Sequence, residues 1–170
     1  MVNLAIITAR KNSKRLKNKN KKILGSKPLV CWTINFAKRL KIFDDILITT
    51  DDNDILKIAK KKKILAPWLR PKNLAKDKTS SYKTVLHALK WYEKEYSKVR
   101  CIFLLQPTSP FRSKKSILNA YKIFLKTKKS VISVMQKKSK VLSEKKRKKF
   151  SIKKFIFSLR LFFFNKSQRT

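Results

Sequence analysis

The start of the chain constrains its fold most strongly, because an apolar, strand-like segment there gives way abruptly to a cationic one. Residues 4–8 read Leu-Ala-Ile-Ile-Thr, and residues 9–20 that follow are mostly basic or polar. This pattern is typical of a buried parallel strand whose carboxyl end opens into an anion-binding loop. Ligands of open α/β sheets bind at such strand ends. The alternative is a solvated basic loop, which a chain this rich in lysine offers in many places.

The loop after this strand offers two kinds of donor to phosphate oxygens. The cationic donors are Arg10, Lys14, Arg15 and Lys19. The neutral donors are Asn12, Ser13 and Asn20. The chain has a single glycine, which excludes both glycine-rich phosphate-binding motifs. A phosphate site in this chain must therefore be built by side chains from several loops.

The net charge of +37 raises the question of a nucleic-acid or anionic-membrane partner. Arginine supplies only nine of the 46 basic residues, however, and lysine is spread over nearly every segment. Clustered arginine would be expected where forked donors bind bases or phosphates. The abundance of Lys, Asn, Ile and Phe instead favours the coding bias of an AT-rich genome. We expect no specific nucleic-acid partner, and any nucleic-acid binding should be non-specific and steeply salt-dependent.

The length of 170 residues and the hydrophobic content of 42% predict one domain with a substantial core. Cys31 and Cys101 lie in apolar stretches, and we interpret them as buried thiols in a reducing compartment. Basic residues near the start interrupt any signal-peptide core. The longest apolar segment, residues 155–164, is too short to cross a bilayer. These observations predict a cytoplasmic protein without a membrane span.

Strand and helix patterns alternate along residues 1–135. Apolar runs predict strands at residues 4–8, 45–50, 64–66, 101–105 and 130–134. Helical spacing of apolar side chains predicts helices at residues 29–40, 55–59, 79–92 and 116–125. This alternation predicts an α/β domain over residues 1–135, with a mostly parallel sheet flanked by crossover helices. Residues 136–170 are predicted to form a divergent basic and aromatic tail, either out of frame or loosely ordered.

A second polar loop follows the strand predicted at residues 101–105. Its prolines, Pro107 and Pro110, fix φ and leave the neighbouring side chains little conformational entropy to lose. The polar side chains presented in this way are Gln106, Thr108, Ser109 and Arg112. In a parallel sheet this loop lies at the same edge as the loop of residues 10–20.

A third polar segment covers residues 69–71 and 77–81. Arg70 precedes Pro71, and the simplest alternative reading is a surface arginine braced by a proline. For Ser80 and Ser81 the alternative is simple capping of the next helix. Three such segments at the ends of parallel strands predict a nucleotide pocket.

Four segments together resemble the acylneuraminate cytidylyltransferase family, the CMP-sialic acid synthetases. They are residues 5–20, 69–71, 77–81 and 105–112, and their order and spacing agree with the family over about residues 2–135. The resemblance implies a Rossmann-like nucleotidyltransferase fold. It also implies transfer of CMP from CTP to the anomeric hydroxyl of a nine-carbon acidic sugar, with release of diphosphate and with Mg²⁺ as the cofactor.

The resemblance further implies a role for each matching residue. The nucleotide-binding residues would be Arg10, Ser13, Lys19, Asn20, Arg70 and Ser80. The residues near the acceptor sugar would be Gln106, Thr108 and Ser109. Those that act on the reacting groups would be Arg10, Lys19 and Gln106. This chemistry needs fixed cations and oriented donors, because two anionic substrates must meet.

The chain departs from the family where metal ligands are concerned. The family's Asp-x-Asp pair for Mg²⁺, its sugar-pocket residues and its dimerisation segment belong to a C-terminal portion that has no counterpart here. Asp52 and Asp54 have the right spacing, but they stand where an aspartate routinely caps a helix. The metal ligands are therefore unknown, and a homodimer would be weakened.

Three functional hypotheses follow from these patterns. The first is the cytidylyltransferase, and the second is a nucleotide-binding remnant without catalysis. The third is a basic protein that binds nucleic acid or a membrane surface through residues 137–154. Because residues 136–170 lose all periodicity and hold a single acid, Glu144, we interpret them as the product of a reading-frame shift. Turnover by such a chain should be poor, and translating the downstream DNA in the other two frames tests the shift.

Overall fold

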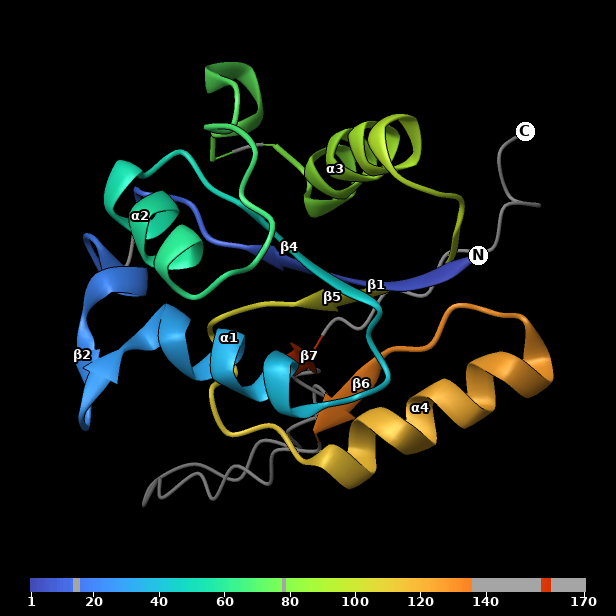
Figure 1. The fold of residues 1–170 in the computed structure, drawn as a ribbon. Helices are drawn as coiled ribbons and strands as arrows, with labels where there is room; N and C mark the ends of the chain where they lie inside the picture. The colour runs from blue at the N-terminus through green and yellow to red at the C-terminus, as the bar shows by residue number, and fades with distance from the viewer. Residues whose placement is uncertain (14–15, 78, 136–156, 160–170) are drawn as a thin grey trace, which may run out of the picture.

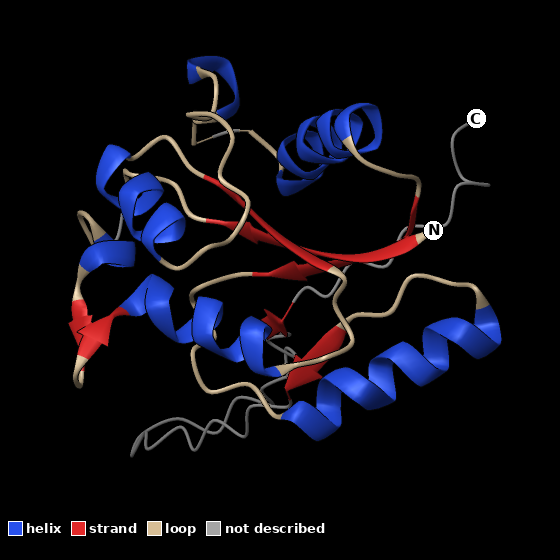
Figure 2. Cartoon of the chain, in the orientation of Figure 1, coloured by secondary structure: helices blue, strands red, loops and turns tan. Residues whose placement is uncertain are grey.

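A computed structural model describes residues 1–13, 16–77, 79–135 and 157–159 of the protein. Its centre is a parallel sheet of three strands in the order β4-β1-β5 (Figures 1 and 2). The strands are β1 (Val2–Thr8), β4 (Asp45–Thr49) and β5 (Val99–Leu105). The predicted parallel α/β sheet is thereby confirmed, and three of the five predicted strands form it.

Strand β1 is the middle strand, and its apolar run is buried because both of its faces are covered. Leu4, Ala5, Ile6 and Ile7 have no exposed surface. Their side chains alternate between two separate apolar clusters, as the period of a strand requires. The sheet is therefore the middle layer of three.

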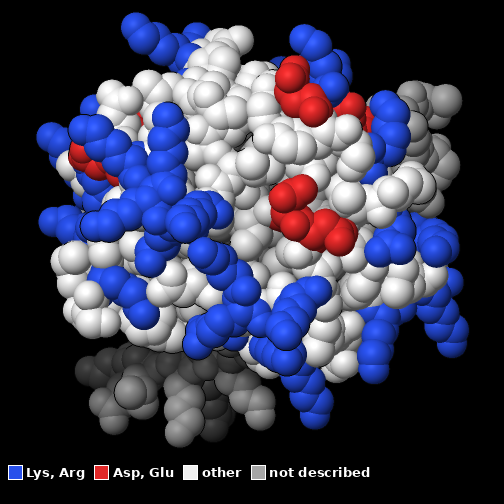
Figure 3. Space-filling model, in the orientation of Figure 1, with Lys and Arg blue, Asp and Glu red and all other residues white. Residues whose placement is uncertain are grey.

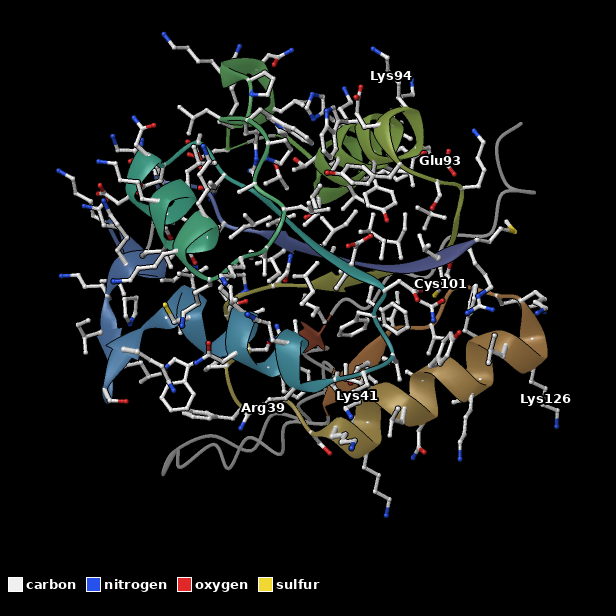
Figure 4. All side chains as sticks on the ribbon, in the orientation of Figure 1. Arg39, Lys41, Glu93, Lys94, Cys101 and Lys126 are labelled. Atoms are coloured by element: carbon white, nitrogen blue, oxygen red, sulfur yellow. The ribbon has the colours of Figure 1, made fainter. Side chains whose placement is uncertain are left out.

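The helices α1 (Leu29–Arg39) and α4 (Lys114–Thr127) cover one face of the sheet, and α3 (Ser81–Glu95) covers the other (Figure 1). The first cluster joins Ala5 and Ile7 to the apolar sides of α1 and α4. The second joins Leu4 and Ile6 to α3. Cys101 on β5 is fully buried in the first cluster (Figure 4), and both cysteines of the chain are free thiols, as predicted.

The order of the strands makes the carboxyl end of β1 a topological switch point. The chain leaves β1 through α1 to reach β4 on one side, whereas β5 pairs with β1 on the other side. The loops after β1 and β5 leave adjacent strand ends, and both lead to helices on the same face of the sheet, α1 and α4. A crevice is left between them at the strand ends, which is where open α/β sheets bind ligands.

Helix α2 (Asn53–Lys61) begins at the cap that the sequence predicted. The Asp52 carboxylate accepts a hydrogen bond from the backbone N–H of Asp54 at 2.9 Å. The strand predicted at residues 64–66 is reduced to a single parallel bridge between Leu47 and Leu65. Its extent is short because Pro67 follows at once, and proline cannot donate to a strand ladder.

Four short elements were not expected from the sequence. They are η1 (Lys19–Lys21), β2 (Ile23–Leu24), β3 (Lys27–Pro28) and η2 (Lys72–Leu74). Strands β2 and β3 form a tight antiparallel hairpin. Gly25, the single glycine of the chain, lies in the hairpin turn with φ of +61°. Such a φ strains residues that carry a Cβ.

The strand predicted at residues 130–134 forms only in part and does not join the parallel sheet. Strand β6 (Ser133–Met135) lies outside the three-stranded sheet and pairs antiparallel with β7 (Phe157–Leu159). A strand of three residues has too short a pattern to indicate its neighbour. The tail predicted to be irregular therefore contains one strand, and its other residues lie outside the described part of the chain.

A substitution at Gly25 tests the cost of the left-handed turn. A Cβ built there meets nothing closer than Trp32 Cζ2 at 3.7 Å, so the expected penalty is conformational rather than steric. We expect Gly25→Ala to lower the free energy of unfolding by about 1 kcal/mol. Gly25→Asn should cost less, because asparagine tolerates this conformation better.

The measurement is urea unfolding followed by circular dichroism, with Ser26→Ala at the exposed neighbouring position as the control. A Gly25→Ala protein as stable as the wild type would show that the hairpin turn carries no conformational strain.

Candidate functional site

A pocket with a volume of about 300 Å³ opens at the carboxyl edge of the sheet. Three segments line it, namely the end of β1 with its loop, the segment that leads into α3, and the loop after β5. The lining residues are Thr8, Arg10, Ser13, Lys19, Asn20, Arg70, Leu74, Lys76, Asp77, Thr79, Ser81, Thr84, Gln106, Pro107 and Thr108. The three polar segments predicted to share one edge of the sheet thus do meet.

Arg10 and Asn20 belong to the loop after β1 and are held by the fold. The buried Asn20 donates a hydrogen bond from Nδ2 to the backbone carbonyl of Arg10 at 2.9 Å, which fixes the base of the loop. The Arg10 guanidinium forms an ion pair with Asp77 at 2.7 Å, where both side chains remain about one-third exposed. The cation therefore stands at the pocket with a partner that an anionic ligand could replace.

Arg70 is the most deeply buried cation of the pocket, with 7% of its surface exposed. It donates from Nε to Thr49 Oγ1 at 3.1 Å and from Nη2 to the Thr49 carbonyl at 2.5 Å. Burial lowers the pKa of its guanidinium to about 10, against a smaller upward effect of Asp51. Within the described residues no carboxylate forms an ion pair with Arg70. A buried cation in this position is stabilised by an anionic ligand.

Gln106 enters the pocket on a loop that is held from behind by Arg112. The Arg112 guanidinium donates to the carbonyl of Gln106 and to Thr33 Oγ1 on α1, the latter at 3.0 Å. It also lies over the ring of Phe36, with 5.9 Å between the guanidinium carbon and the ring centroid. Burial lowers the pKa of Arg112 to about 10. Arg112 does not line the pocket but fixes the loop that presents Gln106 and Thr108.

Two of the predicted site residues lie beside the pocket rather than in its lining. Ser80 caps α3 by accepting a hydrogen bond from the backbone N–H of Lys83 at 3.3 Å, and its neighbour Ser81 lines the pocket instead. Ser109 is absent from the lining, and its backbone N–H donates to the Gln106 carbonyl at 3.3 Å. The capping alternative therefore describes the contact that Ser80 makes.

Sequence reasoning missed two threonines of the lining, Thr8 and Thr84. Thr8 ends β1, where the apolar run stops, and Thr84 lies one turn into α3 after its Ser80 cap. Both are polar residues next to the carboxyl edge of the sheet, where the sequence predicted the nucleotide pocket. That adjacency is the signal that could have identified them.

The candidate metal ligands do not form a metal site. Asp52 caps α2, and both Asp52 and Asp54 bind Lys21 Nζ, at 3.2 Å and 2.7 Å. In the described part of the chain no three His, Cys, Asp or Glu side chains converge on one point, and the pocket has a single carboxylate, Asp77. The described residues therefore hold no preformed set of protein ligands for Mg²⁺, a cation that is usually bound by one or two carboxylates together with waters and substrate phosphates.

The described helices include none that is both long enough and apolar enough to span a bilayer.

Comparison with solved structures supports the nucleotidyltransferase fold. The chain matches a CMP:2-keto-3-deoxy-manno-octonic acid synthetase complexed with CTP, with a TM-score of 0.65 and 15% identity. That match covers 79% of this chain and 54% of the other. A 4-diphosphocytidyl-2C-methyl-D-erythritol synthase from Anaerococcus prevotii matches with a TM-score of 0.60 and 19% identity, covering 98% of this chain and 66% of the other. At these identities the likeness concerns the fold alone.

Comparison by sequence identifies the family. A family model described as cytidylyltransferase matches residues 4–156. The CMP-N,N'-diacetyllegionaminic acid synthase of Legionella pneumophila is 39% identical over 131 residues, which cover 77% of this chain and 56% of that protein. The N-acylneuraminate cytidylyltransferase of Escherichia coli is 42% identical, over 71% of this chain and 28% of that protein. The chain thus spans about half or less of these relatives' length, and it belongs to the cytidylyltransferase family, with acylneuraminate-type members among its relatives.

Proposed function

We propose that the chain binds CTP in the pocket at the carboxyl edge of the sheet and serves in the transfer of CMP to a nonulosonic acid. The observation that carries the proposal is Arg70, a buried guanidinium without a carboxylate partner among the described residues, at the floor of a pocket rimmed by Arg10 and Lys19. The names of the relatives, which are synthases and cytidylyltransferases of legionaminic, neuraminic and pseudaminic acids, support this substrate class.

The proposed reaction is a substitution at the α-phosphorus of CTP. The anomeric oxygen of the sugar acid forms a bond to this phosphorus, and the bond to the β-phosphate bridging oxygen breaks. Diphosphate leaves with the electron pair of the broken bond, and the proton of the anomeric hydroxyl passes to solvent water. Negative charge accumulates on the leaving group, so fixed cations stabilise the transition state.

Each residue of the pocket has a proposed role in this reaction. Arg10 and Lys19 would neutralise the triphosphate, Ser13 and Asn20 would orient its oxygens and the ribose, and Arg70 would hold the nucleotide from below. The acceptor would lie beside Gln106 and Thr108, on the loop that Arg112 fixes. Ser80 would hold the start of α3 by capping it, and Ser109 would hold the loop after β5 through its backbone hydrogen bond to the Gln106 carbonyl. Mg²⁺ and a homodimer stay predictions from the resemblance, and no step is assigned to the metal.

The other two hypotheses remain as alternatives to test. A cytoplasmic setting is proposed with the enzyme, supported by two free, buried cysteines. A release assay decides between the enzyme and the nucleotide-binding remnant. It measures diphosphate formed from CTP, UTP or ATP with Mg²⁺ and a panel of nonulosonic acids. CTP-dependent release that requires the sugar acid supports the enzyme, whereas CTP binding without release with any acceptor supports the remnant.

Removal of the Arg10 side chain should weaken nucleotide binding. In Arg10→Ala a charge-assisted contact worth about 1.5–3 kcal/mol is lost, so we expect CTP affinity to fall roughly tenfold or more. Isothermal titration calorimetry measures the change. Lys11→Ala is the matched control, because it removes one cation next to Arg10 from a residue outside the pocket lining. Equal affinity of wild type and Arg10→Ala would contradict the assignment.

Substitution of Gln106 should separate acceptor use from nucleotide binding. We expect Gln106→Ala to leave CTP affinity unchanged and to impair binding and turnover of the acidic sugar, because the amide lies on the acceptor side of the pocket. Parallel titrations of CTP and of N-acetylneuraminic acid provide the measurement, with Ser109→Ala as the control outside the lining. If Gln106→Ala loses CTP and retains sugar binding, the two roles are reversed.

A further inference from the structure

A second hollow lies outside the pocket, between the carboxyl ends of α1 and α2. We call it the lysine groove. Its volume is about 630 Å³, and it is lined by Lys27, Trp32, Asn35, Lys38, Arg39, Lys61, Lys62 and Lys63. It shares no lining residue with the pocket at the sheet edge. Figure 3 shows Lys and Arg gathered over α1 and α2 on this face, and Arg39 at the end of α1 is labelled in Figure 4.

The six cations of the lysine groove have no acidic partner among the described residues. Lys38 Nζ donates to the backbone carbonyl of Lys62 at 2.9 Å, and Lys27 Nζ lies 4.2 Å from the ring centroid of Trp32. Lys21, by contrast, is neutralised by two aspartates at the other end of α2. Six like charges around one hollow repel one another, and a polyanion in the hollow would relieve that repulsion.

Neither composition nor helix chemistry explains this arrangement fully. Coding bias scatters lysines over a surface but does not bring six cations to one concavity. Cations at the carboxyl end of a helix offset its dipole, which accounts for Lys38, Arg39, Lys61 and the C-cap residue Lys62. Lys27 precedes α1, and Lys63 follows α2 with φ of +53°, so helix dipoles do not account for these two.

An aromatic platform adjoins the lysine groove. The Trp32 indole is fixed by a hydrogen bond from Nε1 to the Leu24 carbonyl at 2.9 Å. Phe111 packs edge-on against it, with ring centroids 5.5 Å apart, yet 76% of Phe111 is exposed. Sequence-tolerant proteins of single-stranded nucleic acids combine a cationic groove with exposed aromatic rings on which bases stack.

We propose that the lysine groove binds the phosphate backbone of a single-stranded nucleic acid, with a base stacked on Phe111. The hollow favours a strand over a bilayer, because cations around a concavity cannot all reach a flat layer of headgroups. Lysine-rich binding makes the interaction independent of base sequence. The proposal rests on charge and shape at α1 and α2, so it stands or falls separately from the cytidylyltransferase function.

The test measures binding of labelled oligo(dT) and oligo(U) of about twelve nucleotides by fluorescence anisotropy over a range of KCl concentrations. If all six cations contact phosphates, the plot of log K against log[KCl] has a slope of about −4. The variant Arg39→Gln/Lys61→Gln/Lys62→Gln should flatten that slope by about 2. DNA and RNA should bind alike, since the contacts are to phosphates.

A matched variant separates the groove from net charge. Lys115→Gln/Lys122→Gln/Lys126→Gln removes the same charge from the exposed side of α4 and should leave the slope unchanged. Phe111→Ala should lower the affinity about fivefold or more while keeping the slope, because it removes stacking and no charge. Circular dichroism of each variant confirms that the fold is retained.

Four results would overturn the proposal. The first is failure of the wild type to bind either oligonucleotide, and the second is an equal loss of oligonucleotide affinity in the two triple variants. The third is displacement of the oligonucleotide by CTP. The fourth is binding to phosphatidylserine–phosphatidylcholine vesicles that is stronger than binding to the oligonucleotide and is abolished in the groove variant. The second would assign binding to net charge, the third to the pocket, and the fourth to a membrane surface.

Discussion

The rest of the structure depends on the burial of β1 between two parallel neighbours. A strand paired on both edges and covered on both faces is mostly apolar, and a polar side chain within it, such as Asn3, must find its hydrogen-bond partners inside the protein. A run of exposed polar residues can begin only where the chain leaves the sheet. That point is Thr8, and the side chains that we propose to bind phosphate follow at once. Because β1 and β5 pair in parallel, the loops that follow these two strands begin side by side at this edge. The position of the pocket is thus a consequence of strand order.

Two arginines of this edge, the buried Arg70 and the half-buried Arg112, have different roles. Arg112 donates to Thr33 Oγ1 and to the Gln106 carbonyl, both within the protein. Its guanidinium therefore holds the loop after β5 in place. Arg70 binds the Thr49 backbone and side chain but also lines the pocket. Neither has a carboxylate partner among the described residues. Burial lowers the pKa of both to about 10, which leaves both charged at neutral pH.

The sequence was sufficient to predict the layers and the edge of the sheet, because long periodic segments and strand ends carry strong patterns. It was also sufficient to place Arg10, Asn20, Arg70 and Gln106 near one another. It could not tell Ser80 from Ser81, since capping turns one hydroxyl to the backbone and leaves the next free to face the pocket. The hairpin around Gly25 and the antiparallel partner of β6 were missed, because elements of two or three residues have no measurable period.

The arrangement of positive charge gives the surface two different kinds of proposed anion site. At the sheet edge, Arg10 is held by Asp77 and Arg70 by Thr49, so few donors are oriented with precision, as a small nucleotide requires. In the lysine groove, six cations surround a hollow about twice as large, and the contacts among the described residues orient only Lys27 and Lys38. Such a site gains from counterion release rather than from geometry, and it suits a polymer. A genome that enriches lysine raises charge everywhere. Only the fold, by bringing the ends of α1 and α2 together, turns part of that charge into a groove.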